Sequence, residues 1–153
     1  LENGSISATQ FRDEIRRHIH GHVTDEQIDN ALGKFLIGIP VERLRMLEEL
    51  HKDFKVYILS NTNPIMWEQG IKRFFEADGH CRDYYFDGEV ASFKARCVKP
   101  DQAIFRYAID HLGIDPEETL FFDDSVVNTE AAAKLGFKTM HVAPGKNIID
   151  LLP

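Results

Sequence analysis

Cysteine is scarce in this 153-residue chain, and its two cysteines form no recognisable pattern. Cys81 and Cys97 are too far apart for the Cys-x-x-Cys spacing of a zinc site, and one pair cannot form a disulfide framework. We therefore expect two reduced thiols in a cytoplasmic protein.

Long apolar runs and an excess of basic residues are also missing. No run approaches the roughly 20 apolar residues of a membrane span, and the start of the chain has no signal-peptide pattern. Lys and Arg number 18 against 25 Asp and Glu, a net charge of -7. This balance argues against nucleic acid or an anionic membrane as the main partner. Hydrophobic residues, at 43%, suffice for a globular core.

The first third of the chain has helical periodicity. Ser7 and Gln10, and again Thr24 and Gln27, have the spacing of a capping box, which predicts a helix start after each. Apolar residues then recur every three or four positions. A third helix is expected to begin at Pro40, because proline suits the first helical position.

The period changes from residue 54 onward. Short runs rich in β-branched and aromatic residues predict buried strands at 54–59, 119–122 and 138–142, and a shorter strand at 84–86. Helical patterns separate these runs. Such alternation predicts an α/β fold with a parallel sheet. Because ligands bind at the carboxyl ends of parallel strands, residues just after each strand are the candidates for chemistry.

The run Ser60-Asn61-Thr62-Asn63 follows the first predicted strand. Its hydroxyl, amide and backbone N–H groups can donate to an anion, and the next helix directs its positive end toward the same place. The alternative is that Asn63 only caps that helix. Capping accounts for one polar residue but not for four, so the run favours an anion site.

Asp123 and Asp124 follow the strand predicted at 119–122. Two adjacent carboxylates repel each other and favour a bound cation, and hard oxygen ligands suit Mg²⁺, which is often shared with a phosphate. A solvated acidic turn is the alternative for such a pair.

Lys99 precedes Pro100 and Asp101 at the expected start of a helix. Proline restricts the backbone there and fixes the direction of Lys99. A lysine can hold a phosphate oxygen or neutralise a carboxylate. Taken alone, it could equally be a surface lysine.

Taken in order, residues 59–63, 98–101 and 120–132 resemble motifs II, III and IV of the haloacid dehalogenase-like superfamily of hydrolases. The similarity extends over nearly the whole chain. It implies a Rossmannoid parallel sheet with helices on both faces and a small α-helical cap. Residues 1–40 would then be part of the cap, and residues 41–153 the core domain.

The Ser-Asn-Thr-Asn form of motif II resembles two subgroups of this superfamily. They are sugar-phosphate phosphatases of the α-glucose-1-phosphate type and the phosphatase domain of bifunctional epoxide hydrolases. The resemblance implies that Ser60 and the backbone of Asn61 bind the phosphoryl group. Thr62 and Asn63 are expected to line the substrate side.

The same resemblance assigns the remaining motif residues. Lys99 would be catalytic, holding a phosphoryl oxygen and the nucleophile carboxylate. Asp123 and Asp124 would coordinate Mg²⁺ directly or through water. Asp124, also expected to be catalytic, would be the direct ligand, and Asn128 would brace the loop. The implied function is a Mg²⁺-dependent phosphomonoester hydrolase acting on a small phosphorylated metabolite through an aspartyl-phosphate.

Two alternatives remain open at this point. A haloacid dehalogenase has a related core but uses no metal, and the adjacent Asp123 and Asp124 argue against it. A catalytically inactive domain that only binds ligands is the other alternative.

The motif that supplies the nucleophile in this superfamily, Asp-x-Asp after the first strand, does not occur in residues 1–153. We expect it to lie before Leu1, on a strand between those at 54–59 and 119–122. Unpaired edges of two buried strands are costly, so residues 1–153 alone are expected to be inactive and unstable.

The natural protein is accordingly predicted to carry a few dozen residues before Leu1, with Asp-x-Asp among them. Intact mass and N-terminal sequencing of the purified natural protein measure this directly. A native chain that starts at Leu1 would contradict the assignment of phosphatase activity to this molecule.

Overall fold

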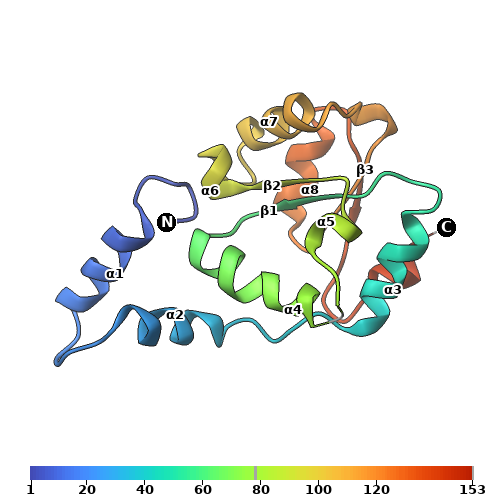
Figure 1. Cartoon of the computed structure of the whole chain (residues 1–153). Coiled ribbons are helices and arrows are strands. Elements are labelled where there is room, and N and C mark those ends of the chain that lie inside the picture. The colour runs from blue at the N-terminus through green and yellow to red at the C-terminus, as the bar shows by residue number, and fades with distance from the viewer. Residues whose placement is uncertain (78, 153) are drawn as a thin grey trace. The chain divides into compact units, whose positions relative to one another are not determined.

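A computed structural model describes residues 1–77 and 79–152. The chain divides into two compact units, Leu1–Arg96 and Cys97–Pro153. In the described residues, no helix combines the length and apolar character that crossing a membrane would need. Figure 1 shows the elements of both units along the chain.

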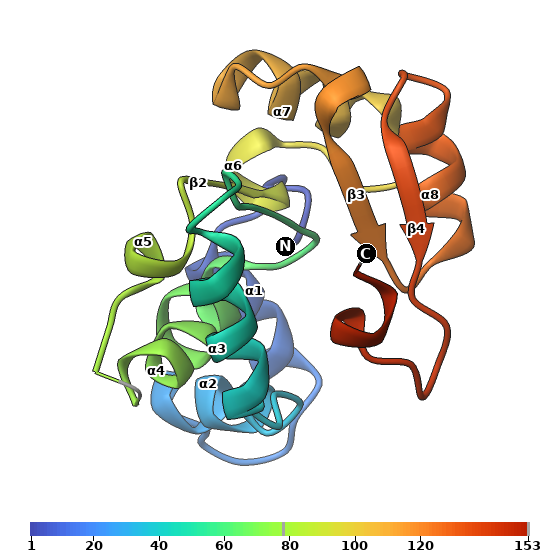
Figure 2. The same cartoon turned by 90° about the vertical axis from the view of Figure 1, so that its right-hand side faces the viewer.

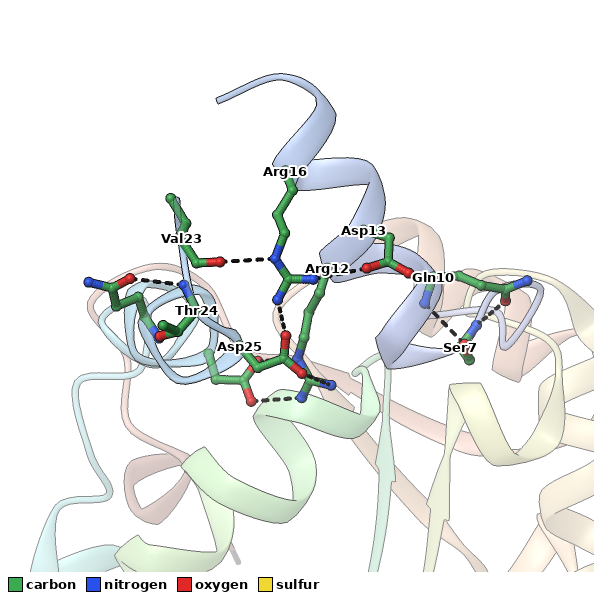
Figure 3. Close-up of polar contacts among 10 residues, drawn as sticks. Ser7, Gln10, Arg12, Asp13, Arg16, Val23, Thr24 and Asp25 are labelled. Atoms are coloured by element: carbon green, nitrogen blue, oxygen red, sulfur yellow. Dashed lines mark hydrogen bonds and ion pairs between the residues drawn. The ribbon is translucent and has the colours of Figure 1, made fainter. Parts of the chain in front are cut away.

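The first unit begins with three helices, α1 (Ala8–Arg17), α2 (Asp25–Gly33) and α3 (Val41–Leu50). Both predicted capping boxes are confirmed. The hydroxyl of Ser7 accepts from the backbone N–H of Gln10, whose side chain accepts from the N–H of Ser7. Thr24 and Gln27 repeat this pair of bonds, as Figure 3 shows for both boxes. The third helix begins at Val41, one residue after the predicted start, with Pro40 as its N-cap.

Two arginines of α1 connect it to α2 (Figure 3). Arg12 binds Asp29 through two hydrogen bonds of 2.8 and 2.7 Å. Arg16 donates to the carbonyl of Val23 at 2.9 Å and also binds Asp25. The hydrogen bonds from Arg12 hold the pKa of Asp29 below its usual value. An ionised, largely buried carboxylate therefore joins the two helices.

The first unit contains one parallel strand pair, β1 (Tyr57–Ser60) and β2 (Gly88–Ala91). A long helical segment follows β1 and includes the π-helix η1 (Met66–Ile71) and α4 (Lys72–Glu76). The short helices α5 (Arg82–Tyr85) and α6 (Ser92–Ala95) flank β2. Figure 1 shows β1 and β2 side by side.

The strand predicted at residues 84–86 is wrong, because α5 occupies most of this segment and β2 begins later, at Gly88. Tyr85 is fully buried and packs against Phe75 with ring centroids 5.4 Å apart. Aromatic residues favour strands only when they pack on a sheet, and here they fill a core with Leu44 of α3. Asp87 then aligns the strands, because its carboxylate accepts from the N–H of Val56 at 2.7 Å.

The second unit contains α7 (Gln102–Leu112), the 3-10 helix η2 (Pro116–Glu118), β3 (Leu120–Asp123), α8 (Val126–Ala133), β4 (Lys138–His141) and the 3-10 helix η3 (Ile148–Leu151). The strands β3 and β4 are parallel and pair Asp123 with His141 at their ends. Figure 2 shows α8 alongside them. Phe105 of α7 packs against the rings of Phe121 in β3 and Phe137 just before β4, and these two rings also contact each other.

The predicted α/β fold with parallel strands is confirmed, as are the strands near 54–59, 119–122 and 138–142. Within the described residues the strands form two separate pairs, β1–β2 and β3–β4. The boundary between cap and core at residue 40 stays a prediction, as does a strand between β1 and β3.

Replacing Asp29 by Asn is expected to lower the free energy of unfolding by about 2 kcal/mol at pH 7, because Arg12 loses a charged partner. The pKa of Asp29 is depressed in the folded state. The ionised carboxylate of Asp29 therefore contributes fully to the free energy of unfolding above its unfolded pKa of about 4. This contribution is lost as the pH falls through the lower pKa of the folded state.

Urea denaturation of the complete protein between pH 7 and pH 3 measures this difference. The destabilisation by Asp29→Asn should shrink toward the acid end of the range. Asp13→Asn is the matched control, because its ion pair with Arg16 is exposed and should contribute less than about 1 kcal/mol. A destabilisation that does not depend on pH would contradict the role given to the Asp29 charge.

Candidate active site

The loop Ser60-Asn61-Thr62-Asn63, here called the β1 loop, starts at the carboxyl end of β1. Ser60 is the last residue of the strand and pairs in register with Ala91 of β2. Ser60 is half-buried and Asn61 is exposed, whereas Thr62 and Asn63 are buried. Asn61, Thr62 and Asn63 lie between a strand and a helix as predicted, whereas Ser60 belongs to the strand itself.

Ser92 fixes the β1 loop from the end of β2. Its hydroxyl accepts from the backbone N–H of Thr62 and donates to the carbonyl of Thr62, both at 2.9 Å. Ser92 is fully buried. One side chain thus satisfies both backbone groups of a buried residue, which would otherwise be costly to bury.

Ser92 is not among the candidate residues predicted from the sequence, although a usable signal is present. It is a polar residue directly after a strand, like the other candidates. The strand predicted at 84–86 ends before β2 begins, so that Ser92 is not predicted to follow a strand. The register that pairs Ser60 with Ala91 brings Ser92 beside the β1 loop.

Asn63 caps the helix that follows the β1 loop. Its side-chain oxygen accepts from the N–H of Met66 at 3.0 Å, and its carbonyl accepts from the N–H of Trp67 at 2.9 Å. Capping therefore accounts for Asn63. The role of Thr62 and Asn63 on the substrate side stays a prediction.

In the second unit, Lys99 and Asp123 form a buried ion pair. The ammonium of Lys99 lies 2.7 Å from the carboxylate of Asp123, and their side chains are only 10% and 4% exposed. The ammonium also lies 5.5 Å from the centroid of the Phe121 ring. Lys99 is therefore not a surface lysine.

Two further donors converge on Asp123. The backbone N–H of Ser125 and the side-chain amide of Asn128 each donate to its other oxygen at 2.9 Å. Burial raises the pKa of Asp123, but the hydrogen bonds from Lys99, Asn128 and Ser125 outweigh it and hold the pKa below its usual value. Asp123 is thus a buried, ionised carboxylate that accepts three hydrogen bonds. The alternative interpretation, a solvated acidic turn, does not apply to this residue.

Asp124 differs from its neighbour because it is exposed. Its backbone carbonyl lies 3.1 Å from Nε2 of His141, at the end of β4. This contact connects the turns after the two strands and leaves the carboxylate of Asp124 on the surface of the unit.

The donor set suits Mg²⁺ better than a metal held by protein ligands alone. Among residues 1–77 and 79–152, no three His, Cys, Asp or Glu side chains are grouped so that they could hold a metal. Mg²⁺ needs only one or two carboxylates, because it keeps several waters and shares a substrate phosphate. Asp123 and Asp124 fit this requirement, and their role as ligands stays a prediction.

The structure therefore brings together Lys99, Asp123 and Asn128 in the second unit. The β1 loop and Ser92 are brought together in the first unit. The β1 loop and Asp123 lie at the carboxyl ends of parallel strands, as predicted from the sequence.

Comparison with known proteins gives a family match over most of the chain. Residues 8–136 match the model of the haloacid dehalogenase-like hydrolases. A D-ribitol-5-phosphate phosphatase from Bacteroides thetaiotaomicron is 31% identical over 145 residues, which are 95% of this chain and 70% of that protein. An (S)-2-haloacid dehalogenase from Burkholderia cepacia is 30% identical over 87 residues, 57% of this chain and 35% of that protein.

Among solved structures, an enzyme of the same family from Bacteroides thetaiotaomicron has a TM-score of 0.94 and 37% sequence identity to this chain. The match covers 99% of this chain and 77% of that one. That crystal structure is a complex with magnesium and inorganic phosphate.

Replacing Ser92 by Ala is expected to lower the free energy of unfolding by about 2 kcal/mol, because the N–H and carbonyl of Thr62 both lose their buried partner. Urea denaturation of the complete protein measures this. Ser5→Ala is the control, since Ser5 is exposed. Equal stability of Ser92→Ala and the wild type would show that the two bonds contribute little.

Proposed function

Because the chain belongs to the haloacid dehalogenase-like hydrolase family, we propose that the protein is a Mg²⁺-dependent phosphomonoester hydrolase acting on a small phosphorylated metabolite. The observation that carries this proposal is the buried pair of Lys99 and Asp123 beside Asp124 at the end of β3. A buried ion pair is not needed for stability, whereas phosphoryl transfer needs fixed positive charge and carboxylates for a metal.

The β1 loop binds the phosphoryl group in this proposal. The hydroxyl of Ser60 and the backbone N–H of Asn61 donate to phosphoryl oxygens. Support comes from the rigidity of the loop, because Ser92 and the cap by Asn63 hold the residues that follow. Donors that are fixed before the reaction stabilise developing charge without reorganisation.

Lys99 neutralises negative charge on the transferred group and on the nucleophile. It is oriented for this by Asp123, which is itself held by Ser125 and Asn128. Asp124 would hold Mg²⁺ directly, and Asp123 directly or through water. When bound, the metal supplies further neutralisation of the phosphoryl oxygens.

The nucleophile in this proposal is the first carboxylate of the Asp-x-Asp motif, which residues 1–153 do not contain. It would attack phosphorus and form an aspartyl-phosphate, which water then hydrolyses.

A phosphorylated polyol or sugar is the proposed substrate class. The support is the similarity to a D-ribitol-5-phosphate phosphatase along 95% of this chain. We also propose a cytoplasmic location, where exposed Cys81 would stay reduced.

Dehalogenation is the second candidate, favoured by the similarity to an (S)-2-haloacid dehalogenase. That match covers a smaller part of this chain, 57%. A dehalogenase that uses no metal has no need for an exposed carboxylate at Asp124 next to the bonded one at Asp123.

One set of assays on the complete protein separates these functions. Phosphate release from p-nitrophenyl phosphate and from D-ribitol 5-phosphate is measured with Mg²⁺ and with EDTA, and halide release from a 2-haloacid is measured in parallel. Phosphate release that EDTA abolishes is the expected result. Halide release insensitive to EDTA would support the dehalogenase, and no turnover in any assay would support a binding domain.

The complete protein with Lys99→Ala or Asp124→Asn is expected to lose about two to four orders of magnitude in turnover, because each variant removes charge at the reacting group. The matched controls are Lys138→Ala and Asp110→Asn, both at exposed positions. Circular dichroism checks that each variant folds. Turnover near that of the controls would show that the assignment of that residue is wrong.

A further inference from the structure

Trp67 stands out because it is fully buried but its indole N–H has no hydrogen-bond partner. It lies in the π-helix η1, close behind the β1 loop. We infer that Arg82, which touches Trp67 in two ways, is a positioning residue for the β1 loop and acts on it through Trp67. This inference rests on the proposed role of that loop in phosphate binding.

Arg82 holds both the backbone and the ring of Trp67. Its Nη1 donates to the carbonyl of Trp67 at 2.9 Å, and its guanidinium carbon lies 4.3 Å from the centroid of the indole ring. The π-helix is rare and is frequently found at functional sites. The bond from Arg82 satisfies a carbonyl inside this unusual segment and so favours its register.

The guanidinium is itself fixed to β2. Its Nε donates to the carboxylate of Glu89 at 3.0 Å, and the ammonium of Lys94 binds the other oxygen of Glu89 at 3.2 Å. Burial raises the pKa of Glu89, but the bonds from Lys94 and Arg82 outweigh it and keep the pKa below its usual value. The side chain of Arg82 is only 13% exposed. Strand β2 thus holds Trp67 through one ordered arginine.

Trp67 in turn holds the β1 loop. Its backbone N–H donates to the carbonyl of Asn63 at 2.9 Å, and the neighbouring N–H of Met66 donates to the side chain of Asn63. The indole has no hydrogen bond of its own to orient it. Its orientation therefore depends on packing and on the cation–π contact with Arg82.

The loop is consequently held to β2 at two points. The first point is Ser92, directly after β2, which binds Thr62. The second is Glu89 within β2, which binds Arg82. Arg82 in turn binds Trp67, the residue that donates to Asn63. Loss of Arg82 removes the second point and leaves the first intact. The strand β1 and the bonds of Ser92 remain, so that we expect the chain to fold while Asn61 and Asn63 lose their fixed geometry.

The test compares Arg82→Met, Arg82→Lys and Arg73→Met in the complete protein. Methionine keeps much of the packing volume but has no donors, and lysine restores the charge with its donors on a single nitrogen. Arg73 is the matched control, because it also lies over an aromatic ring, 5.0 Å from the centroid of Phe74, and donates to a carbonyl, that of Gly33. It is exposed and does not bind Trp67 or Glu89.

Three quantities are measured well below the melting temperature of every variant. They are kcat and KM for p-nitrophenyl phosphate with Mg²⁺, the inhibition constant of orthophosphate, and hydrogen–deuterium exchange of a peptide that contains residues 60–66. We expect Arg82→Met to lower kcat/KM and to weaken orthophosphate inhibition by about tenfold each. Hydrogen–deuterium exchange of the peptide should also become faster in Arg82→Met. Arg82→Lys should recover part of the loss in each of the three quantities. Arg73→Met should change each quantity by less than about twofold.

A purely structural role for Arg82 predicts a different outcome. Arg82→Met would then lower the melting temperature but leave the orthophosphate constant and the exchange of residues 60–66 unchanged, and this result would overturn the inference. If the wild type releases no phosphate from any ester, the proposed function fails separately. Exchange then decides the inference: faster exchange in Arg82→Met supports it, and unchanged exchange overturns it.

Discussion

The carboxylate of Asp123 imposes the strictest physical constraint in the second unit. A charge buried at the end of a strand must be paired and hydrogen-bonded, because an unpaired one would cost several kcal/mol, on the order of the stability of a domain. Lys99, Ser125 and Asn128 meet this requirement from three segments: the entry to α7, the turn after β3, and α8. The same bonds that make the charge tolerable also fix the ammonium of Lys99, to which we assign the neutralisation of the phosphoryl group.

The first unit meets a related constraint with neutral groups. The β1 loop leaves its strand inside the protein, where backbone N–H and carbonyl groups need partners. Ser92 provides both partners for Thr62, and the cap by Asn63 provides them for the first turn of the next helix. In a loop that binds phosphate, such hydrogen bonds favour affinity, because donors that are already ordered lose little entropy when a ligand binds.

The two units share a plan in which a short parallel strand presents polar residues at its carboxyl end and a helix follows. In one unit these residues are hydroxyl and amide groups, suited to the oxygens of a phosphate. In the other they are carboxylates and a lysine, suited to a metal and to the charge of a transferred group. Each set of groups is of a chemical type that the proposed hydrolase uses.

The sequence by itself determined the elements whose signals are local. The capping boxes of Ser7 and Thr24 and the apolar runs of β1, β3 and β4 depend on neighbouring residues, and the motif residues after β1 and β3 follow from those strands. Only the tertiary structure decided the rest. Tyr85 lies in a helix because its ring packs against Phe75, Ser92 supports the β1 loop because β2 is in register with β1, and Lys99 is buried because Asp123 lies beside it. These are contacts between residues distant in sequence, and a single sequence contains no local pattern that reports them.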